Sequence, residues 1–228
     1  MFVSLEGIDR AGKTTQATLL AASMGPDTVL LREPGGTEAG ERLRELLKDP
    51  ALDLDPRSEL LLFCAARAEL VERVIRPALA AGVDVVCDRF ADSTVAYQGA
   101  GRGLGTDRVA SINELALRGC LPDLTVLLRI DPNGAADRGQ QRLEGGLPDG
   151  EDRFESEGID FQRRVADAYD EIAGRDIDRV VVVDAERPVD AVQADVLAAV
   201  IARRRSAPVP SAVDAGGDAG QSARKARR

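Results

Sequence analysis

The chain has 228 residues, no histidine and a formal net charge of −9. This length is typical of one domain whose core needs neither disulfides nor a metal for stability. The lack of histidine excludes Ser–His and Cys–His catalytic pairs, so carboxylates, lysine, arginine and a bound cation must carry any chemistry. The acidic charge argues against nonspecific nucleic-acid binding, and no apolar run approaches the ~20 residues that span a bilayer.

The N-terminal segment and the cysteines predict a cytoplasmic protein. No basic stretch precedes the first apolar run, so we expect no signal peptide. Cys64, Cys87 and Cys120 lie far apart without CxxC spacing, which favours buried, reduced thiols over a metal site. A small anionic ligand is compatible with these features, and we expect neither nucleic acid nor a membrane as a partner.

Short apolar runs alternate with stretches of helical spacing along the chain. Strands are predicted at residues 2–5, 28–31, 83–87, 124–130 and 179–183. None of these runs alternates cleanly with polar residues, as expected for strands covered on both faces. Helices are predicted at residues 14–24, 40–47, 58–79, 106–117, 161–173 and 189–203. The alternation predicts an α/β fold with a doubly wound parallel sheet, whose ligands bind beyond the carboxyl ends of the strands.

The segment after the first predicted strand reads GIDRAGKT, residues 7–14, and fits the phosphate-binding pattern G-x-x-x-x-G-K-[ST]. Gly7 and Gly12 permit a tight turn that aims backbone N–H groups at one anion, and the following helix adds its N-terminal dipole. Lys13 should reach the outer phosphates of the ligand, and Thr14 should bind Mg²⁺. A chance glycine-rich turn is the alternative. The predicted ATP-binding residues of this segment are Gly7, Ile8, Asp9, Arg10, Ala11, Gly12, Lys13, Thr14 and Thr15.

Three charged side chains are expected beside these phosphates. Arg10, inside the loop, could stabilise charge on the transferring group as an arginine finger does, or be a solvated loop residue. Asp88 and Arg89 follow the third predicted strand. Asp88 is predicted to bind Mg²⁺ together with Thr14, and Arg89 to hold a second phosphate. An ordinary surface ion pair is the alternative for these two residues.

Two neighbouring segments could hold a flat polar ring such as a nucleobase. Phe63 and Arg67 are four residues apart and so share one helix face, with Phe63 as ordinary core the equal alternative. The segment STVAYQGAGRG, residues 93–103, is predicted to be a loop shaped around a ligand. Tyr97 and Gln98 offer it a hydroxyl and an amide.

Residues at about 135–155 are charged and rich in glycine, which predicts a mobile lid over a triphosphate. This segment contains Arg138, Arg142 and Arg153, and an ordinary charged surface loop is the alternative. Two separate phosphate-binding places, the loop at 7–14 and Arg89, fit a kinase whose acceptor is itself a nucleotide.

The predicted domain organisation is one domain at residues 1–205 followed by a tail at 206–228. Proline, glycine, serine and alanine dominate the tail, which predicts disorder and no enzymatic role. Its basic end could instead contact an acidic partner.

Six motifs stand out together, over roughly residues 1–202: EGIDRAGKTTQ, REPGGT, FCAARAELVERVIRPAL, DRFADSTVAYQGAGRG, PDLTVLL and DRFE. With them the chain resembles the bacterial thymidylate kinase family, in the superfamily of P-loop nucleoside monophosphate kinases. The resemblance implies transfer of the ATP γ-phosphate to dTMP with Mg²⁺, giving ADP and dTDP for dTTP synthesis. It also implies a P-loop NTPase fold of three α/β/α layers, a five-stranded parallel sheet of order 2-3-1-4-5, and a homodimer.

The resemblance assigns roles around dTMP. Phe63 is expected to stack on thymine, Arg67 to hydrogen-bond its edge, and Tyr97 to exclude a ribose 2′-OH. Arg89 is expected to hold the dTMP phosphate. The other residues implied are Asp9 and Glu33 near its sugar and phosphates, and Pro34, Ser93 and Gln98 in the same pocket.

The resemblance also implies Asp9, Arg10, Lys13 and Arg89 as catalytic residues, with Arg138 against adenine opposite residues 185–188. Family members carry the catalytic arginine either in the P-loop or in the lid, and this chain has arginines in both. The fourth strand of the family usually ends in aspartate, where this chain has Arg129.

Two other functions remain open at this point. One is a kinase for another nucleoside monophosphate or a deoxynucleoside, against which the residues Phe63, Arg67, Tyr97 and Gln98 argue. The other is a GTPase-like switch or a P-loop binding module without turnover. Against it, the sequence has no NKxD guanine-binding motif.

Overall fold

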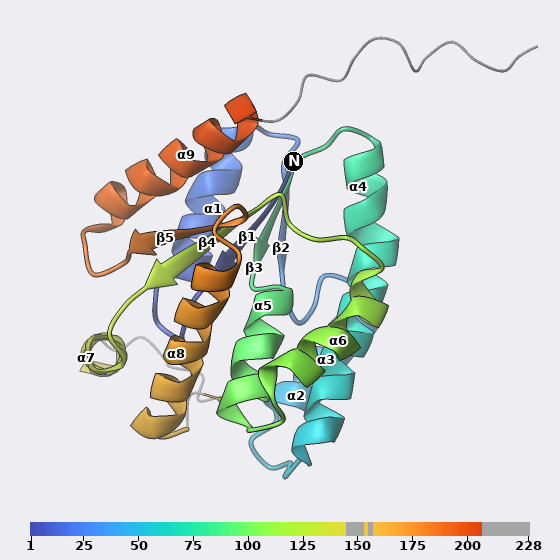
Figure 1. Ribbon diagram of the computed structural model, residues 1–228, viewed down its shortest axis with the longest axis vertical. Coiled ribbons are helices and arrows are strands. Elements are labelled where there is room, and N and C mark those ends of the chain that lie inside the picture. Colours follow the sequence, from blue (N-terminus) through green and yellow to red (C-terminus); the bar gives the residue numbers. More distant parts are fainter. Residues whose placement is uncertain (145–152, 155–156, 207–228) are drawn as a thin grey trace, which may run out of the picture.

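The computed structural model describes residues 1–144, 153–154 and 157–206 of the chain. Its centre is a five-stranded sheet in the order β2-β3-β1-β4-β5, in which every neighbouring pair is parallel (Figure 1). The strands are β1 (Phe2–Glu6), β2 (Val29–Arg32), β3 (Val85–Asp88), β4 (Leu124–Arg129) and β5 (Val180–Asp184). The predicted fold class and strand order are confirmed.

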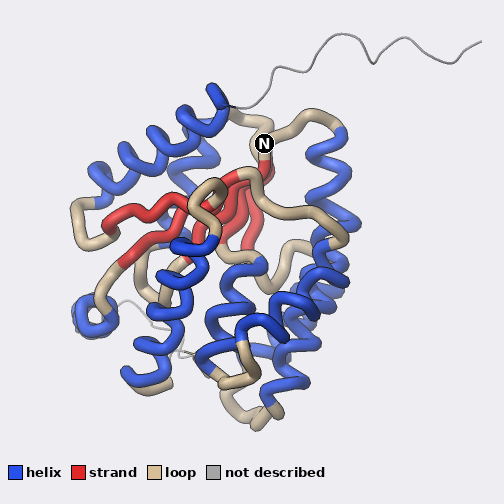
Figure 2. The backbone as a smooth tube through the Cα atoms, in the orientation of Figure 1, coloured by secondary structure: helices blue, strands red, loops and turns tan. Residues whose placement is uncertain are grey.

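Helices cover both faces of the sheet, as Figure 2 shows. α1 and α9 pack together on one face, whereas α8 and the rod formed by α3 and α4 lie on the other. The helices are α1 (Lys13–Met24), α2 (Glu38–Lys48), α3 (Pro56–Leu70), α4 (Arg76–Ala80), α5 (Ala91–Thr94), α6 (Thr106–Leu117), α7 (Pro132–Glu144), α8 (Ile159–Arg175) and α9 (Val189–Ser206). α9 thus includes Ser206, the first residue of the predicted tail, and residues 207–228 lie outside the described part.

The helix predicted at 58–79 forms one continuous rod, in which a π-helical segment (Val71–Ile75) joins α3 to α4. Pro77 is the second residue after this segment, with Arg76 between them. Proline has no N–H to donate and its ring crowds the preceding turn, so a local widening of the helix is favourable just before it.

One secondary-structure prediction is wrong. Residues 93–103 were expected to form a loop, but they continue α5 into a second π-helical segment (Val95–Gly101). A Cβ atom on Gly101 would lie 2.6 Å from the Phe161 ring, and one on Gly99 would lie 3.0 Å from the Thr106 Cα. The glycines therefore allow this helical segment to pack closely on α8 and α6, rather than marking a flexible connector.

Two other details differ from the expectations. No helix was predicted within residues 135–155, but α7 (Pro132–Glu144) occupies their first part. Residues 145–152 and 155–156 lie outside the described part, so the mobile lid stays a prediction. The prediction that the strands are covered on both faces holds only for the centre of the sheet. Leu30 in the edge strand β2 is 44% exposed.

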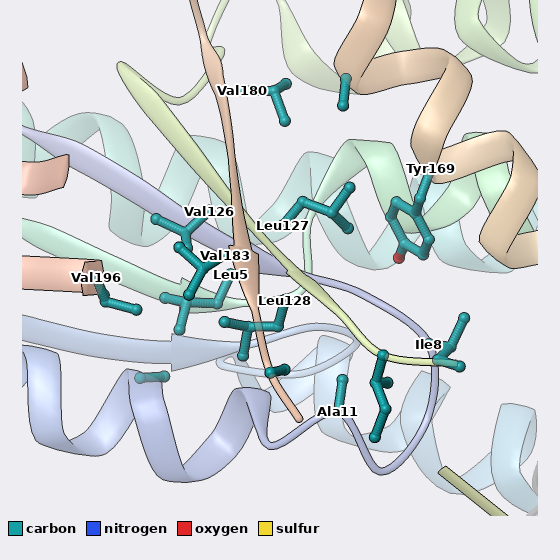
Figure 3. Packing of buried hydrophobic residues seen from close by; sticks show 14 of the residues in the cluster. Leu5, Ile8, Ala11, Val126, Leu127, Leu128, Tyr169, Val180, Val183 and Val196 are labelled. Atoms are coloured by element: carbon teal, nitrogen blue, oxygen red, sulfur yellow. The ribbon is translucent and has the colours of Figure 1, made fainter. Parts of the chain in front are cut away.

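The largest core cluster lies between the sheet and its helices, and it reaches the P-loop. Figure 3 shows Leu5 and Leu128 of the sheet close to Val183, with Ile8 and Ala11 of the loop at the end of the same cluster. Because these two loop residues are anchored in the core, the loop backbone is held against the sheet. The cysteines are buried and unpaired, and no helix in the described ranges is long and apolar enough to cross a membrane.

Candidate active site

The P-loop connects β1 to α1 and has the geometry that its two glycines allow. Gly7 and Gly12 have φ values of 141° and 95°, and a Cβ on Gly7 would lie 2.5 Å from the carbonyl oxygen of Leu128. The Lys13 side chain is buried across the loop, where its Nζ donates a 2.6 Å hydrogen bond to the carbonyl of Ile8. Burial, reinforced by the positive charge of Arg89, lowers the pKa of Lys13 to about 8.

The two predicted metal ligands lie next to each other. β1 pairs with β3, so the start of α1 and the end of β3 meet at the carboxyl edge of the sheet. There the Thr14 hydroxyl donates a 2.5 Å hydrogen bond to Asp88. A hydroxyl and a carboxylate oxygen are ligands that Mg²⁺ prefers, so the pair fits the predicted role.

Arg89 joins the P-loop to α5 and the π-helical segment after it. Its Nη1 donates to the carbonyl of Gly7 at 3.0 Å and to Ser93 at 3.2 Å, and its Nη2 donates to Asp9. Nη2 also donates to the Tyr97 hydroxyl at 3.1 Å, and the guanidinium lies 4.8 Å from the centre of the Tyr97 ring. Burial alone would raise the pKa of Asp9, but the charges of Arg89 and Lys13 outweigh it and lower the pKa.

Glu6 contacts Ser93, one of the partners of Arg89, and was not predicted as a site residue. Its carboxylate is fully buried and accepts hydrogen bonds from the Phe90 N–H at 2.8 Å, Ser93 at 2.6 Å and Tyr169 at 2.9 Å. Burial, followed by the charge of Asp92, raises its pKa. Glu6 is the one charged residue in the otherwise apolar and serine-containing β1, which is the signal that could have identified it.

Arg67 and Glu33, two of the predicted dTMP-binding residues, form a buried ion pair. Arg67 is 1% exposed, and its Nε and Nη2 donate to Glu33 Oε2 at 2.9 and 2.5 Å. Its Nη1 donates to Asn113 at 2.8 Å. The other oxygen of Glu33, Oε1, is buried without a hydrogen-bond partner among the described residues. Burial raises the pKa of Glu33 to about 7, although the charge of Arg67 opposes this.

The remaining predicted acceptor residues surround an aromatic group. Phe63 is half-buried, and its ring centre lies 5.8 Å from that of Phe154, which is 6.2 Å from the centre of the Tyr97 ring. Phe154 was not predicted as a site residue. Gln98 does not face this group freely, because its Nε2 donates to Glu59 at 2.9 Å. The carbonyl of Pro34 accepts a 2.9 Å hydrogen bond from Arg44.

Among the predicted ATP-binding residues, Arg10 of the P-loop and Arg138 of α7 lie next to each other. The Arg10 guanidinium lies against Gly139 of α7, and Arg138 donates to the carbonyl of Arg10 at 3.4 Å and to that of Ala185 at 2.5 Å. Arg153 does not join this group; it donates to Glu59 of α3 at 3.2 Å. The side chain of Arg142 lies outside the described part. Thr15 is exposed on α1.

A cavity of about 810 Å³ lies beyond the carboxyl ends of β4 and β5. It touches the P-loop at Gly7 and Ile8, but none of the predicted dTMP-binding residues lines it. Arg129 lines this cavity and forms an ion pair with Asp170 of α8 at 2.6 Å. The arginine at the end of the fourth strand therefore pairs with α8 rather than with the residues around Arg89.

A parallel sheet in this order, with a G-x-x-x-x-G-K-T loop between β1 and α1 and an aspartate beside the loop threonine, defines a P-loop nucleotide-binding protein. The family model for thymidylate kinase matches residues 5–196. The thymidylate kinase of Deinococcus radiodurans is 44% identical over 206 residues, covering 89% of this chain and 97% of the relative. That of Chlorobaculum tepidum is 46% identical over 193 residues, covering 81% of this chain and 89% of the relative.

A solved structure agrees with these sequence comparisons. The crystal structure of thymidylate kinase from Ehrlichia chaffeensis is 34% identical and has a TM-score of 0.71, covering 88% of this chain and 98% of that one. The chain belongs to the thymidylate kinase family and is a phosphotransferase of the kinase type.

Proposed function

We propose that this protein transfers the γ-phosphate of ATP to dTMP, giving ADP and dTDP for dTTP synthesis. The observation that carries the proposal is the position of Arg89, whose guanidinium contacts both the P-loop at Gly7 and Asp9 and the wall of a second site at Ser93 and Tyr97. A cation directly beside the phosphate-binding loop suits an acceptor that carries its own phosphate. Membership of the thymidylate kinase family supports dTMP as that acceptor.

On the donor side, the loop N–H groups and Lys13 bind the phosphates of ATP. Arg10 contacts the transferring group, and Arg138 lies against adenine beside Ala185. Mg²⁺ bound to Thr14 and Asp88 would neutralise charge on the β- and γ-phosphates. These residues position the donor and compensate its charge, which is the main contribution a protein makes to phosphoryl transfer.

On the acceptor side, Arg89 exchanges part of its contact with Asp9 for the dTMP phosphate. Phe63 stacks on thymine, Arg67 and Glu33 bind near its edge and the sugar, and Tyr97 excludes a 2′-OH. The dTMP phosphate is already anionic near neutral pH, so the reaction needs no strong base. That agrees with a chain that has no histidine.

The other acceptor residues act through their neighbours. Ser93 donates to Glu6 and Gln98 to Glu59, so both shape the pocket wall, together with the backbone at Pro34. We also propose that the protein works in the cytoplasm as a homodimer, that residues 1–205 form its single domain, and that neither nucleic acid nor a membrane is its partner.

Measurement of ADP formation from ATP and Mg²⁺ with a panel of acceptors tests the proposal. The panel contains dTMP, dUMP, UMP, CMP, GMP, AMP, thymidine and no acceptor. Strong turnover with dTMP, weaker turnover with dUMP and little with UMP is expected, because Phe63 and Arg67 select the base and Tyr97 the sugar. A different preferred acceptor would keep the kinase and overturn the acceptor, and silence with every acceptor would overturn the enzyme.

A further inference from the structure

Glu59 in α3 is fully buried, and the mechanism above does not use it. Both of its oxygens accept hydrogen bonds. Oε1 accepts from Gln98 at 2.9 Å and from Arg102 Nε at 3.1 Å, and Oε2 accepts from Arg102 Nη2 and from Arg153 Nη2, each at 3.2 Å. One buried carboxylate thus holds two guanidinium groups.

These partners come from segments far apart in the chain. Gln98 and Arg102 belong to the π-helical segment after α5 and its end, and Arg153 belongs to the DRFE motif before α8. Arg102 also forms an ion pair with Glu157. A buried charge is tolerated only when it is paired, so Glu59 fixes where α3 and these two segments meet.

The residue next to Arg153 is Phe154, which contacts two of the residues proposed to bind the acceptor. The Phe154 ring contacts Phe63 and Tyr97 edge to face, with ring centres 5.8 and 6.2 Å apart. The Arg102 guanidinium lies over the same ring, 5.7 Å from its centre. Whatever holds Arg102 and Arg153 therefore also sets the position of Phe154 against the two residues that are to contact thymine and the sugar.

We propose that Glu59 is a positioning residue for the acceptor nucleotide. By holding Arg102 and Arg153, it seats Phe154 as the wall of the pocket opposite α3. The proposal rests on dTMP being the acceptor. Within the described residues, Glu59 accepts hydrogen bonds from Gln98, Arg102 and Arg153 and from no residue of the P-loop. Its effect should therefore fall on acceptor binding and leave ATP binding unchanged.

Two variants test this role by steady-state kinetics. Glu59→Gln keeps the shape of the side chain but removes its charge, and Arg153→Gln removes one partner while Arg102 still pairs with Glu59. Each should raise the KM for dTMP by about 10-fold or more and leave the KM for ATP within about 2-fold, because small misplacements of a binding wall have effects of this size. Arg153→Lys should restore most of the loss.

The control is Glu69→Gln, in the same helix, whose carboxylate pairs with Arg73 at the surface, 3.5 Å away. Its KM values should equal those of the wild type. The KM for dTMP of the double variant Glu59→Gln/Arg153→Gln should not exceed that of the more impaired single variant, because the effects of residues that act as a unit are not additive.

Turnover of dTMP by the wild type distinguishes failure of the proposed function from failure of the role of Glu59. No wild-type turnover with dTMP would overturn the proposed function. Normal wild-type turnover, with an unchanged KM for dTMP in Arg153→Gln or an equal rise in the KM for ATP, would overturn the role of Glu59 alone. If Glu59→Gln does not fold, as judged by circular dichroism, the Arg153 variants decide the question.

Discussion

The hydroxyl of Thr14 donates a 2.5 Å hydrogen bond to the carboxylate of Asp88, although the two residues are 74 positions apart. Thr14 lies in the first turn of α1, and Asp88 ends β3. The parallel pairing of β1 with β3 brings them to the same edge of the sheet. Two oxygen ligands suitable for Mg²⁺ are thus in contact beside the phosphate-binding loop.

Asp88→Asn should therefore increase the Mg²⁺ concentration needed for half-maximal activity by about 10-fold or more, the usual scale for losing an oriented metal-site partner. The measurement is ADP formation at saturating ATP and dTMP over a Mg²⁺ titration. Asp107→Asn is the control, since Asp107 is an exposed residue of α6. Equal Mg²⁺ dependence in the two variants would remove Asp88 from the metal site.

Arg10→Ala should lower kcat by about 100-fold, on the scale of arginine-finger losses. Arg10 lies in the loop against α7, whereas Arg153 of the predicted lid is bound to Glu59 on the acceptor side. Arg138→Ala should instead raise the KM for ATP, with a smaller effect on kcat. An almost unchanged kcat in Arg10→Ala would assign the catalytic role to a lid arginine.

Gly139→Ala should separate stability from activity. Alanine is favoured over glycine inside a helix by about 1 kcal/mol, so the Tm should stay constant or rise. The new Cβ would contact the Arg10 guanidinium, which must move, and kcat should fall by about 10-fold. Gly134→Ala in the same helix is the matched control, because its nearest neighbour is 3.7 Å away. An equal kcat in the two variants would contradict the contact between α7 and Arg10.

The pKa of Lys13, lowered to about 8 by burial, predicts a pH dependence of ATP binding. Below pH 8 the side chain is charged and attracts the phosphates, and above it the charge is lost. The value of kcat/KM for ATP should therefore fall as the pH rises through about 8, because this ratio reports the free enzyme. In Lys13→Arg this inflection should be absent, because a guanidinium does not titrate here.

The same shift has a consequence for stability. Since Lys13 binds its proton less tightly in the folded protein than in the unfolded chain, the unfolded chain holds more protons above pH 8. The free energy of unfolding should therefore rise with pH from about 8 upwards through this group. Denaturant titrations of the wild type and Lys13→Met at pH 7.5 and 9.5 measure this, and an equal pH dependence in both would refute it.

The strands and the P-loop could be predicted from the sequence, because each depends on a local pattern of residues. Apolar runs gave all five strands to within two residues at each end, and G-x-x-x-x-G-K-T gave the P-loop with Lys13 and Thr14. Residues 93–103 could not be assigned correctly, because their glycines are read locally as a loop signal. Only the tertiary structure shows that Gly99 packs closely on α6 and Gly101 on α8, where a larger side chain would not fit.

Side-chain partners were decided by the tertiary structure. The sequence placed Asp88 and Arg89 at a strand end, but it held no sign that Glu6 would accept from Ser93 and Tyr169, or that Arg153 would reach Glu59. Such pairs join residues that no periodicity relates. A spacing of two or 3.6 residues determines which face a side chain occupies within its own element. Which other element lies against that face depends on the order of the strands and the crossing of the helices, and this is settled only when the whole chain packs.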